Sequence, residues 1–287
     1  MKSKAYGSIR VFKKQQNWDR NLPKISIITV TYNRLKDLSE TFSNVISQTY
    51  QNLEYIVIDG GSEDGTADFL RENSANISYW ISEKDAGIYD AMNKGALAAT
   101  GDWVIFMNSG DKFFAEDTLT KVAEYLDNSV DVVYGGVESV FNDRYGYRTY
   151  QRKPYDLSII WREIPACHQS IFVRRELQVQ YPFDTLLNWC ADHDFIAKVY
   201  VAGYRFQEIP IVISRFDASG GVSRDLLNFT KERWSLCRRY FGKSFEQDLY
   251  FLNEYKNFWL QKTIISKMRN LLPSQWLVAL RKYRGIY

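Results

Sequence analysis

The first half of the chain alternates short apolar runs with segments of helical spacing. Four of these runs are rich in β-branched residues and predict buried strands, at 24–33, 53–59, 77–81 and 103–107. One face of the helix predicted after the first strand carries Leu38, Phe42, Val45 and Ile46. Residues 88–99 show a second apolar helical face. Strands and helices that alternate at this spacing predict an α/β fold with a mostly parallel central sheet flanked by helices.

The second half of the chain is less regular. Apolar runs predict further strands at 131–137, 169–173 and 206–216, and helical spacing predicts a helix at 190–204. The glycine-bearing segment 218–223 predicts a loop. The remaining tail is predicted to be helical in most places.

Polar side chains gather where the strands of the first half end. These residues are Thr31, Tyr32, Asn33, Asp59, Glu83, Asp85, Asn108, Ser109 and Asp111. Taken singly, each is an ordinary turn residue. In a parallel sheet, however, the carboxyl ends of the strands share one edge, and ligands bind in the crevice there. We therefore expect four loops to meet at one binding crevice.

The composition of the chain argues against disulfide-rich, zinc-binding and membrane-spanning proteins. The chain has 287 residues and a net charge of +3. Residues 225–287 carry 12 Lys and Arg against 5 Asp and Glu, so a mildly acidic body precedes a basic, aromatic tail. Three scattered cysteines without a CxxC pair argue against a disulfide framework and a structural zinc site. We expect no signal peptide, because residues 1–20 contain no apolar h-region. We also expect no membrane-spanning helix, because no apolar run reaches about 18 residues.

The chain lacks two common nucleotide-binding motifs. Neither GxGxxG nor GxxxxGK[ST] occurs, so the dinucleotide-binding and P-loop interpretations lose their main support. Asp192, His193 and Asp194 begin a predicted helix, where the two acids point in different directions and do not chelate one metal. Either acid can act as a general base or simply cap the helix.

Four segments resemble the family 2 glycosyltransferases of GT-A fold. They are ISIITVTYNR, YIVIDGGSEDGT, SEKDAGIYDAMNKGALAATGDWVIFMNSGD and FDASGGVS. The resemblance is strongest to bacterial enzymes that build colanic-acid-type exopolysaccharide, capsule and O-antigen. It covers residues 24–223 and includes the order and spacing of every strand-end loop.

The resemblance assigns roles to individual residues. Those that match its nucleotide and donor site are Thr31, Tyr32, Asn33, Asp59, Asp85, Asn93, Lys94, Asn108, His168, Gln169 and Gly221. Asp111 matches the last carboxylate of a loop that reads Asp-Ser-Asp-Asp in many relatives, which implies contact with a divalent cation, Mg²⁺ or Mn²⁺. One carboxylate can suffice, because Mg²⁺ takes much of its coordination from phosphate and water. Asp192 matches the catalytic base of an inverting displacement.

Three positions depart from the pattern of the relatives. Ala191 stands where many relatives have Glu, so a second acid beside Asp192 is absent. Met92 stands where many have an Arg near the phosphates, which leaves Lys94 as the nearest cation of that segment. Gly60 replaces an Asp that can contact uracil, so donors linked to UDP, GDP or dTDP all stay open.

The implied function is transfer of a sugar from a nucleotide-diphosphate donor to a lipid-linked glycan acceptor, in bacterial surface polysaccharide synthesis. We expect an N-terminal extension (1–23), a GT-A domain (24–223) and a helical C-terminal region (224–287). Two other interpretations stay open, namely a catalytically degenerate sugar-nucleotide-binding protein and a sugar nucleotidyltransferase.

The basic, aromatic tail bears on partners and localisation. Its composition suits a helix lying on an anionic lipid surface. That implies a cytoplasmic protein held peripherally at the inner face of the cytoplasmic membrane. The same aromatic residues also suit packing on the catalytic domain or on a second copy of the chain in a homo-oligomer. Nucleic-acid binding is disfavoured, because the body is acidic and no binding module is recognised.

Overall fold

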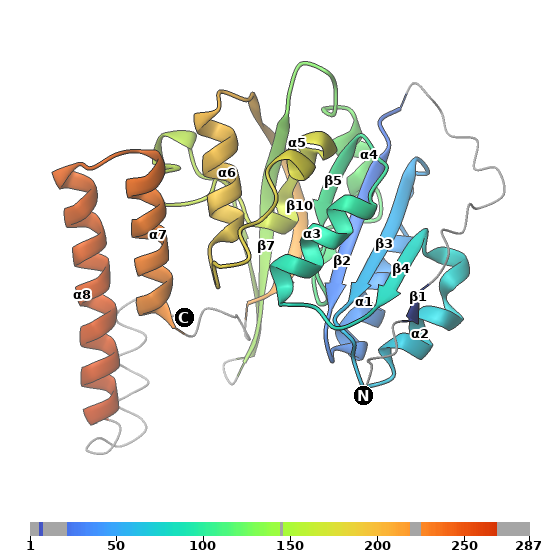
Figure 1. Cartoon of the computed structure of the whole chain (residues 1–287), viewed down its shortest axis with the longest axis horizontal. Coiled ribbons are helices and arrows are strands. Elements are labelled where there is room, and N and C mark those ends of the chain that lie inside the picture. Colours follow the sequence, from blue (N-terminus) through green and yellow to red (C-terminus); the bar gives the residue numbers. More distant parts are fainter. Residues whose placement is uncertain (1–5, 8–21, 144–145, 219–224, 269–287) are drawn as a thin grey trace. The chain divides into compact units, whose positions relative to one another are not determined.

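The computed structural model of the chain describes residues 6–7, 22–143, 146–218 and 225–268 (Figure 1). The chain divides into two compact units, Met1–Val222 and Ser223–Tyr287.

The first unit combines one large sheet with helices. Its strands are β1 (Tyr6–Gly7), β2 (Ile25–Thr31), β3 (Leu53–Asp59), β4 (Tyr79–Ser82), β5 (Trp103–Phe106), β6 (Lys112–Phe113), β7 (Val132–Asp143), β8 (Gly146–Arg152), β9 (Ile171–Arg174) and β10 (Phe206–Asp217). Its helices are α1 (Leu35–Ile46), α2 (Thr66–Glu72), α3 (Ile88–Ala98), α4 (Thr118–Ala123), α5 (Arg175–Gln180) and α6 (Ala191–Val201), with 3₁₀ turns η1 (Ser74–Asn76), η2 (Leu157–Ile159) and η3 (His168–Ser170).

The sheet is mixed, and its central strands are parallel, as the sequence predicts. Its strand order is β1-β4-β3-β2-β5-β9-β7-β10-β6, with β8 paired to β7. The pairs β2–β3, β2–β5, β3–β4 and β7–β10 are parallel, whereas β9 runs antiparallel to both of its neighbours. The sequence did not predict β8, whose side chains are largely exposed and therefore lack an apolar run. Pro210 lies where the β7–β10 register shifts, so it costs no regular ladder hydrogen bond there.

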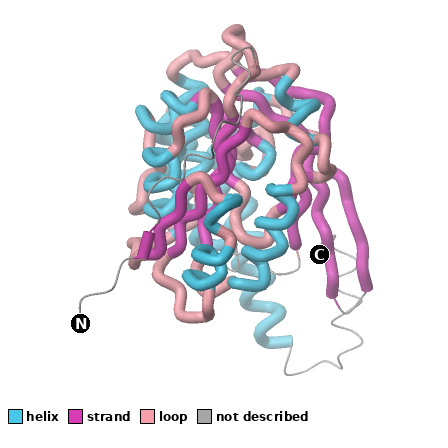
Figure 2. Tube along the Cα trace, turned by 90° about the vertical axis from the view of Figure 1, so that its right-hand side faces the viewer, coloured by secondary structure: helices cyan, strands magenta, loops and turns pink. Residues whose placement is uncertain are grey.

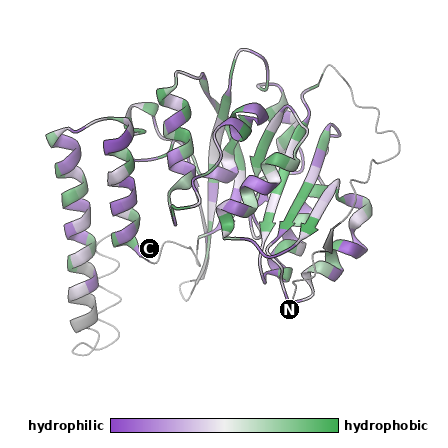
Figure 3. Ribbon diagram, viewed as in Figure 1, coloured by the Kyte–Doolittle hydropathy of each residue, from purple (hydrophilic) through white to green (hydrophobic). Residues whose placement is uncertain are grey.

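Helices cover both faces of the central strands (Figures 1 and 2), so these strands are buried on both sides and mostly hydrophobic (Figure 3). On one face, Leu38, Phe42 and Val45 of α1 pack into a core that includes Ile25 and Ile27 of β2. Ile46 was expected on this apolar face but is 47% exposed, because α1 ends there.

Helix α3 covers the other face at close range. A Cβ atom added to Gly95 would lie 2.4 Å from Cγ2 of Ile28 and 3.4 Å from Cγ1 of Ile58. Glycine at this position therefore lets the helix backbone approach β2 and β3 closely. This contact sets the position of the loop before α3, which lies at the carboxyl edge of the sheet.

A buried carboxylate anchors the amino edge of the sheet. Glu54 is 3% exposed and accepts hydrogen bonds of 2.6 Å from both Ser26 Oγ and Thr100 Oγ1. The backbone N–H groups of Thr100 and Gly101 also donate to it, and Lys24 Nζ lies 3.1 Å away. Burial alone would raise the pKa of Glu54, but these hydrogen bonds and the Lys24 charge outweigh it and lower the pKa below its usual value.

The second unit is a helical pair, α7 (Leu226–Tyr240) and α8 (Phe245–Met268). Phe251 of α8 is fully buried and stacks on Trp234 of α7, with ring centroids 6.2 Å apart. The carboxylate of Asp248 accepts hydrogen bonds from Trp234 Nε1 at 2.6 Å and from the Arg238 guanidinium. In the described part of the chain, the helices are too short or too polar to cross a membrane.

Candidate active site

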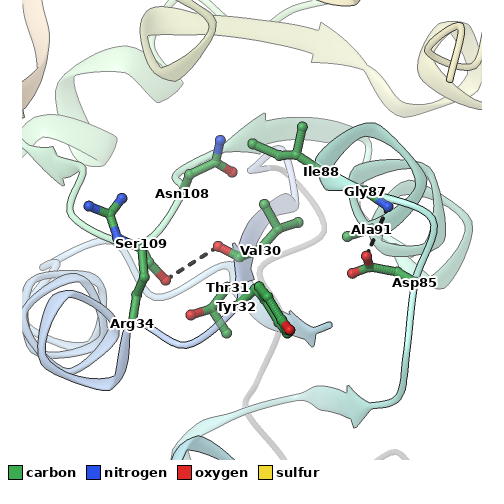
Figure 4. Close-up of a pocket in the computed structure, with 10 residues that line it drawn as sticks. All are labelled: Val30, Thr31, Tyr32, Arg34, Asp85, Gly87, Ile88, Ala91, Asn108 and Ser109. Carbon is green, nitrogen blue, oxygen red and sulfur yellow. Dashed lines mark hydrogen bonds between the residues drawn. The ribbon is translucent and has the colours of Figure 1, made fainter. Parts of the chain in front are cut away.

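A pocket of ≈ 300 Å³ opens at the carboxyl edge of the sheet (Figure 4). It is formed by the ends of β2 and β5 and by the loop that leads into α3. The residues that line it are Val30, Thr31, Tyr32, Arg34, Asp85, Gly87, Ile88, Ala91, Asn108 and Ser109. Four of the predicted donor-site residues, Thr31, Tyr32, Asp85 and Asn108, are among them. The strand-end loops thus meet as a parallel sheet requires.

Asn33 holds two of these loops together. Its backbone has a φ of 51°, a left-handed conformation that Asn tolerates better than most residues. Its N–H donates to Ser62 Oγ at 2.7 Å, and its side-chain Oδ1 accepts from the N–H of Glu63 at 2.9 Å. Asn33 therefore fixes the loop after β2 against the loop after β3.

Asp59 is fully buried at the end of β3. Ser62 Oγ donates to its Oδ1 at 2.5 Å, and Ser82 Oγ donates to its Oδ2 at 2.6 Å. The Ser62 N–H also donates to Oδ2, at 3.1 Å. Both carboxylate oxygens are thus engaged, and Asp59 shapes the crevice from beneath rather than lining it.

Asp85 lies against the backbone of Gly60. A Cβ atom added to Gly60 would be 2.7 Å from Asp85 Oδ2 and 3.2 Å from Cδ2 of Tyr32. The other oxygen, Oδ1, accepts a hydrogen bond from the N–H of Gly87 at 2.9 Å. The space left by the missing side chain of residue 60 is therefore filled by the Asp85 carboxylate, beside the exposed ring of Tyr32.

Asn93 and Lys94 are not among the residues that line the pocket. Both ends of the Asn93 amide bond the backbone of Phe183, each at 2.9 Å. Lys94 Nζ pairs with Glu83 at 2.9 Å and with Asp90 at 3.5 Å. These contacts position the loops around α3, and direct contact of either side chain with a nucleotide would require breaking them.

Arg34 supplies the positive charge of the pocket lining in the described part of the chain. It lies across the pocket from Asp85 (Figure 4) and pairs through Nε with Asp37 at 2.9 Å. The sequence interpretation favoured Lys94 as the cation nearest the phosphates and did not select Arg34. The available signal was the basic residue that ends the TYNR motif, one position after Asn33.

A second group of side chains lies where the loop after β5 approaches η3 and α6. His168 Nε2 is 3.1 Å from Nδ2 of Asn108 and 3.8 Å from Oδ2 of Asp111. Its other ring nitrogen, Nδ1, is 3.9 Å from Oδ2 of Asp192. The imidazole therefore stands between the predicted metal carboxylate and the predicted base.

Burial perturbs all three ionisable groups. It raises the pKa of Asp111 to about 7, although the Arg34 charge and a backbone hydrogen bond act in the opposite direction. It also raises the pKa of Asp192 and lowers the pKa of His168 to about 4. Burial disfavours the charged form of both carboxyl groups, and the neutral imidazole beside them supplies no positive charge. A bound cation would supply that charge and stabilise both carboxylates.

The remaining candidates near Asp192 have structural partners. Asp194 is fully buried and pairs with Lys198 at 2.5 Å, so it is the less suitable base. His193 is 4% exposed, and its Nε2 lies 2.7 Å from the carbonyl oxygen of Ile160. Gln169 is buried beneath this region at 4% exposure. Gly221 lies outside the described residues.

The sequence matches a known family over most of the segments that build this site. A family model described as Glycosyl transferase family 2 matches residues 26–185. The chain belongs to glycosyltransferase family 2. It is 30% identical over 218 residues to the PGL/p-HBAD biosynthesis glycosyltransferase Rv2957 of Mycobacterium tuberculosis, a match that covers 72% of this chain and 81% of the relative.

Comparison with solved structures confirms the fold. The chain superimposes on Staphylococcus aureus TarS 1–349 in complex with UDP-GlcNAc with a TM-score of 0.60 and 18% identity, covering 88% of this chain and 77% of that one. In the longer TarS chain the same match spans 46% of the length. The mannosyltransferase PcManGT of Pyrobaculum calidifontis, in complex with GDP-Man and Mn²⁺, matches with a TM-score of 0.57 and 21% identity, covering 95% and 85%. The α/β fold of this glycosyltransferase is therefore GT-A, with helices at the C-terminus.

The donor set near Asp111 suits a divalent cation only in part. Among the described residues, no three His, Cys, Asp or Glu side chains converge well enough to hold a metal. Asn108 Oδ1, however, is buried without a hydrogen-bond partner, and Nδ2 of the same amide lies 3.1 Å from His168 Nε2. A cation here would thus take ligands from few side chains and complete its coordination from a diphosphate and water.

Proposed function

We propose that this glycosyltransferase catalyses inverting transfer of a sugar from a nucleotide-diphosphate donor to a lipid-linked glycan acceptor, with a divalent cation, in bacterial surface polysaccharide synthesis. Residues 24–223 would form the catalytic domain. The observation that carries the proposal is that a pocket and two acidic residues lie next to each other. The pocket lined by Tyr32 and Asp85 offers room for the nucleoside, and Asp111 and Asp192 lie near its Asn108 end.

Each acid has a separate task in this reaction. Asp192 removes the proton from the acceptor hydroxyl as that oxygen attacks the anomeric carbon. Attack from the side opposite the leaving diphosphate inverts the configuration. Asp111 would hold the cation, whose charge stabilises the departing diphosphate. Arg34 points its charge toward the same region and would contact the phosphates, in the role first expected of Lys94.

The nucleotide site can be tested without knowing the acceptor. We expect UDP, GDP or dTDP to raise the unfolding temperature of the purified chain when Mn²⁺ is present, and less without it. Asp111→Ala should abolish the part of the shift that depends on Mn²⁺, whereas Asp117→Asn, an exposed carboxylate paired with Lys121, should not. Absence of a shift with all three nucleotides would remove the donor site and favour a catalytically degenerate protein.

The C-terminal helices would bring the enzyme to the inner face of the cytoplasmic membrane. Phe245, Leu249, Leu252 and Trp259 of α8 are at least 46% exposed, and their spacing places them on one side of the helix together with Lys256. Apolar and aromatic residues beside basic ones favour anionic lipid surfaces. We expect co-sedimentation with vesicles of phosphatidylglycerol but not of phosphatidylcholine alone. A chain that stays in the supernatant with both would rule out this contact.

A further inference from the structure

We propose that His168 is a ligand of the divalent cation, together with Asp111 and Asn108, and that its other ring nitrogen donates a hydrogen bond to Asp192. This inference rests on the proposed function, because the cation is the one that accompanies the donor diphosphate. It adds two protein ligands to the carboxylate of Asp111.

The distance between His168 and Asp111 is close to that of two ligands of one cation. With bonds of about 2.1–2.2 Å, neighbouring ligands of an octahedral ion lie about 3.0 Å apart. His168 Nε2 and Asp111 Oδ2 are 3.8 Å apart, so rotation of the two side chains, without movement of the backbone, brings both within reach of one ion. No intervening side chain is required to bridge them.

Asn108 can complete the protein side of this site. Its Oδ1 is buried and has no hydrogen-bond partner, while its Nδ2 lies 3.1 Å from His168 Nε2. A half-turn of the amide exchanges the two atoms and puts Oδ1 beside Nε2, at the spacing of two ligands at a right angle. After this exchange the amide presents an oxygen, a ligand that divalent cations accept, next to Nε2.

The second nitrogen of His168 links the cation to the base. A metal-bound histidine usually donates its other N–H to a carboxylate, which fixes its tautomer and orientation. The carboxylate that faces Nδ1 is Asp192, at 3.9 Å. This exceeds a hydrogen bond by about 1 Å, a gap that rotation of the Asp192 side chain can close. His168 is thus a positioning residue for Asp192 as well as a metal ligand.

The chemistry of the donor set predicts which metal it prefers. Mg²⁺ favours oxygen ligands, whereas divalent transition-metal ions such as Mn²⁺ accept imidazole nitrogen more readily. A site made of one carboxylate, one amide oxygen and one imidazole should therefore prefer Mn²⁺ to Mg²⁺. Asn108→Asp supplies a second carboxylate and should shift this preference toward Mg²⁺.

Electron paramagnetic resonance can test the nitrogen ligand directly. Mn²⁺ and inorganic pyrophosphate, which stands for the donor diphosphate, would be added to the full chain without a histidine tag. The spin-echo modulation should show a ¹⁴N coupling from a bound imidazole. The chain has two histidines, and the Nε2 of buried His193 is engaged by the Ile160 carbonyl, so loss of the coupling in His168→Ala identifies its source.

Binding affinity provides a second measurement. The six-line signal of free Mn²⁺ reports the bound fraction, and we expect His168→Ala and His168→Gln each to weaken binding by about tenfold or more. The matched control Asp117→Asn should bind like the wild type. His168→Gln keeps a polar side chain of similar reach, so a defect shared by both variants does not reflect misfolding of His168→Ala alone.

The results separate this inference from the proposed function. Bound Mn²⁺ without ¹⁴N coupling, or unchanged affinity in both His168 variants, would overturn the ligand assignment while leaving the donor site intact. Failure of the wild type to bind Mn²⁺ with pyrophosphate would also overturn it. A nucleotide that still stabilises the chain would then show that only the metal site is wrong.

Discussion

The contact between Gly60 and Asp85 allows a quantitative test of how the pocket is built. In Gly60→Ala the new methyl group would lie 2.7 Å from Asp85 Oδ2. Comfortable contacts are about 3.5 Å, so the carboxylate must retreat by roughly 0.8 Å. This strains its 2.9 Å hydrogen bond with the Gly87 N–H. Loss of such a bond to a half-buried carboxylate should lower the free energy of unfolding by about 1–2 kcal/mol.

The sign of the effect should reverse when Asp85 is removed. Without the clash, Gly→Ala stabilises by about 0.4–1 kcal/mol, because it restricts the unfolded chain. We therefore expect Gly60→Ala to destabilise the wild type and to be neutral or stabilising in Asp85→Ala. Guanidinium unfolding of the wild type, both single variants and the double variant measures this coupling. An equal cost of Gly60→Ala in both backgrounds would refute the idea that the carboxylate occupies this space.

Two further predictions concern carboxylates at opposite edges of the sheet. Asp192→Asn should lower the release of nucleoside diphosphate from the donor by about 10²–10⁴-fold while nucleotide binding with Mn²⁺ is kept; loss of both would point to a structural role. Since burial raises the pKa of Asp192, wild-type activity should fall as pH drops toward that raised value. Glu54→Gln should lower the free energy of unfolding by about 2–3 kcal/mol at pH 7. Because the pKa of Glu54 is lowered on folding, its contribution is complete above its unfolded pKa and is lost as pH falls through the folded one. Denaturant unfolding at pH 7, 5 and 3.5 should therefore show the wild type and Glu54→Gln converging only at the lowest pH, and a constant difference would contradict the assigned ionisation.

Local pattern was enough to predict the body of this fold. The runs at 53–59 and 103–107 were found as β3 and β5 within a residue, because strands buried on both faces are continuously apolar. The convergence of the strand-end loops also followed from sequence, since parallel strands present their carboxyl ends at one edge. The exposed hairpin strand β8 was not predicted, because its sequence contains no run of apolar residues.

Roles within the crevice depended on contacts between distant segments. The family resemblance implies that Asn93 and Lys94 flank the nucleotide and its diphosphate, but their partners, Phe183 and Glu83, became apparent only in the folded chain. The same folding brought Arg34 into the pocket lining.

The sequence by itself determined the family, the parallel centre of the sheet and the edge on which the site is built, because periodicity and motif spacing are properties of neighbouring residues. Tertiary structure alone decided that His168 stands between Asp111 and Asp192, and that Asp85 fills the space beside Gly60. Contacts between atoms of different loops depend on how closely the strands and helices pack. A local sequence pattern does not contain the distances between such atoms.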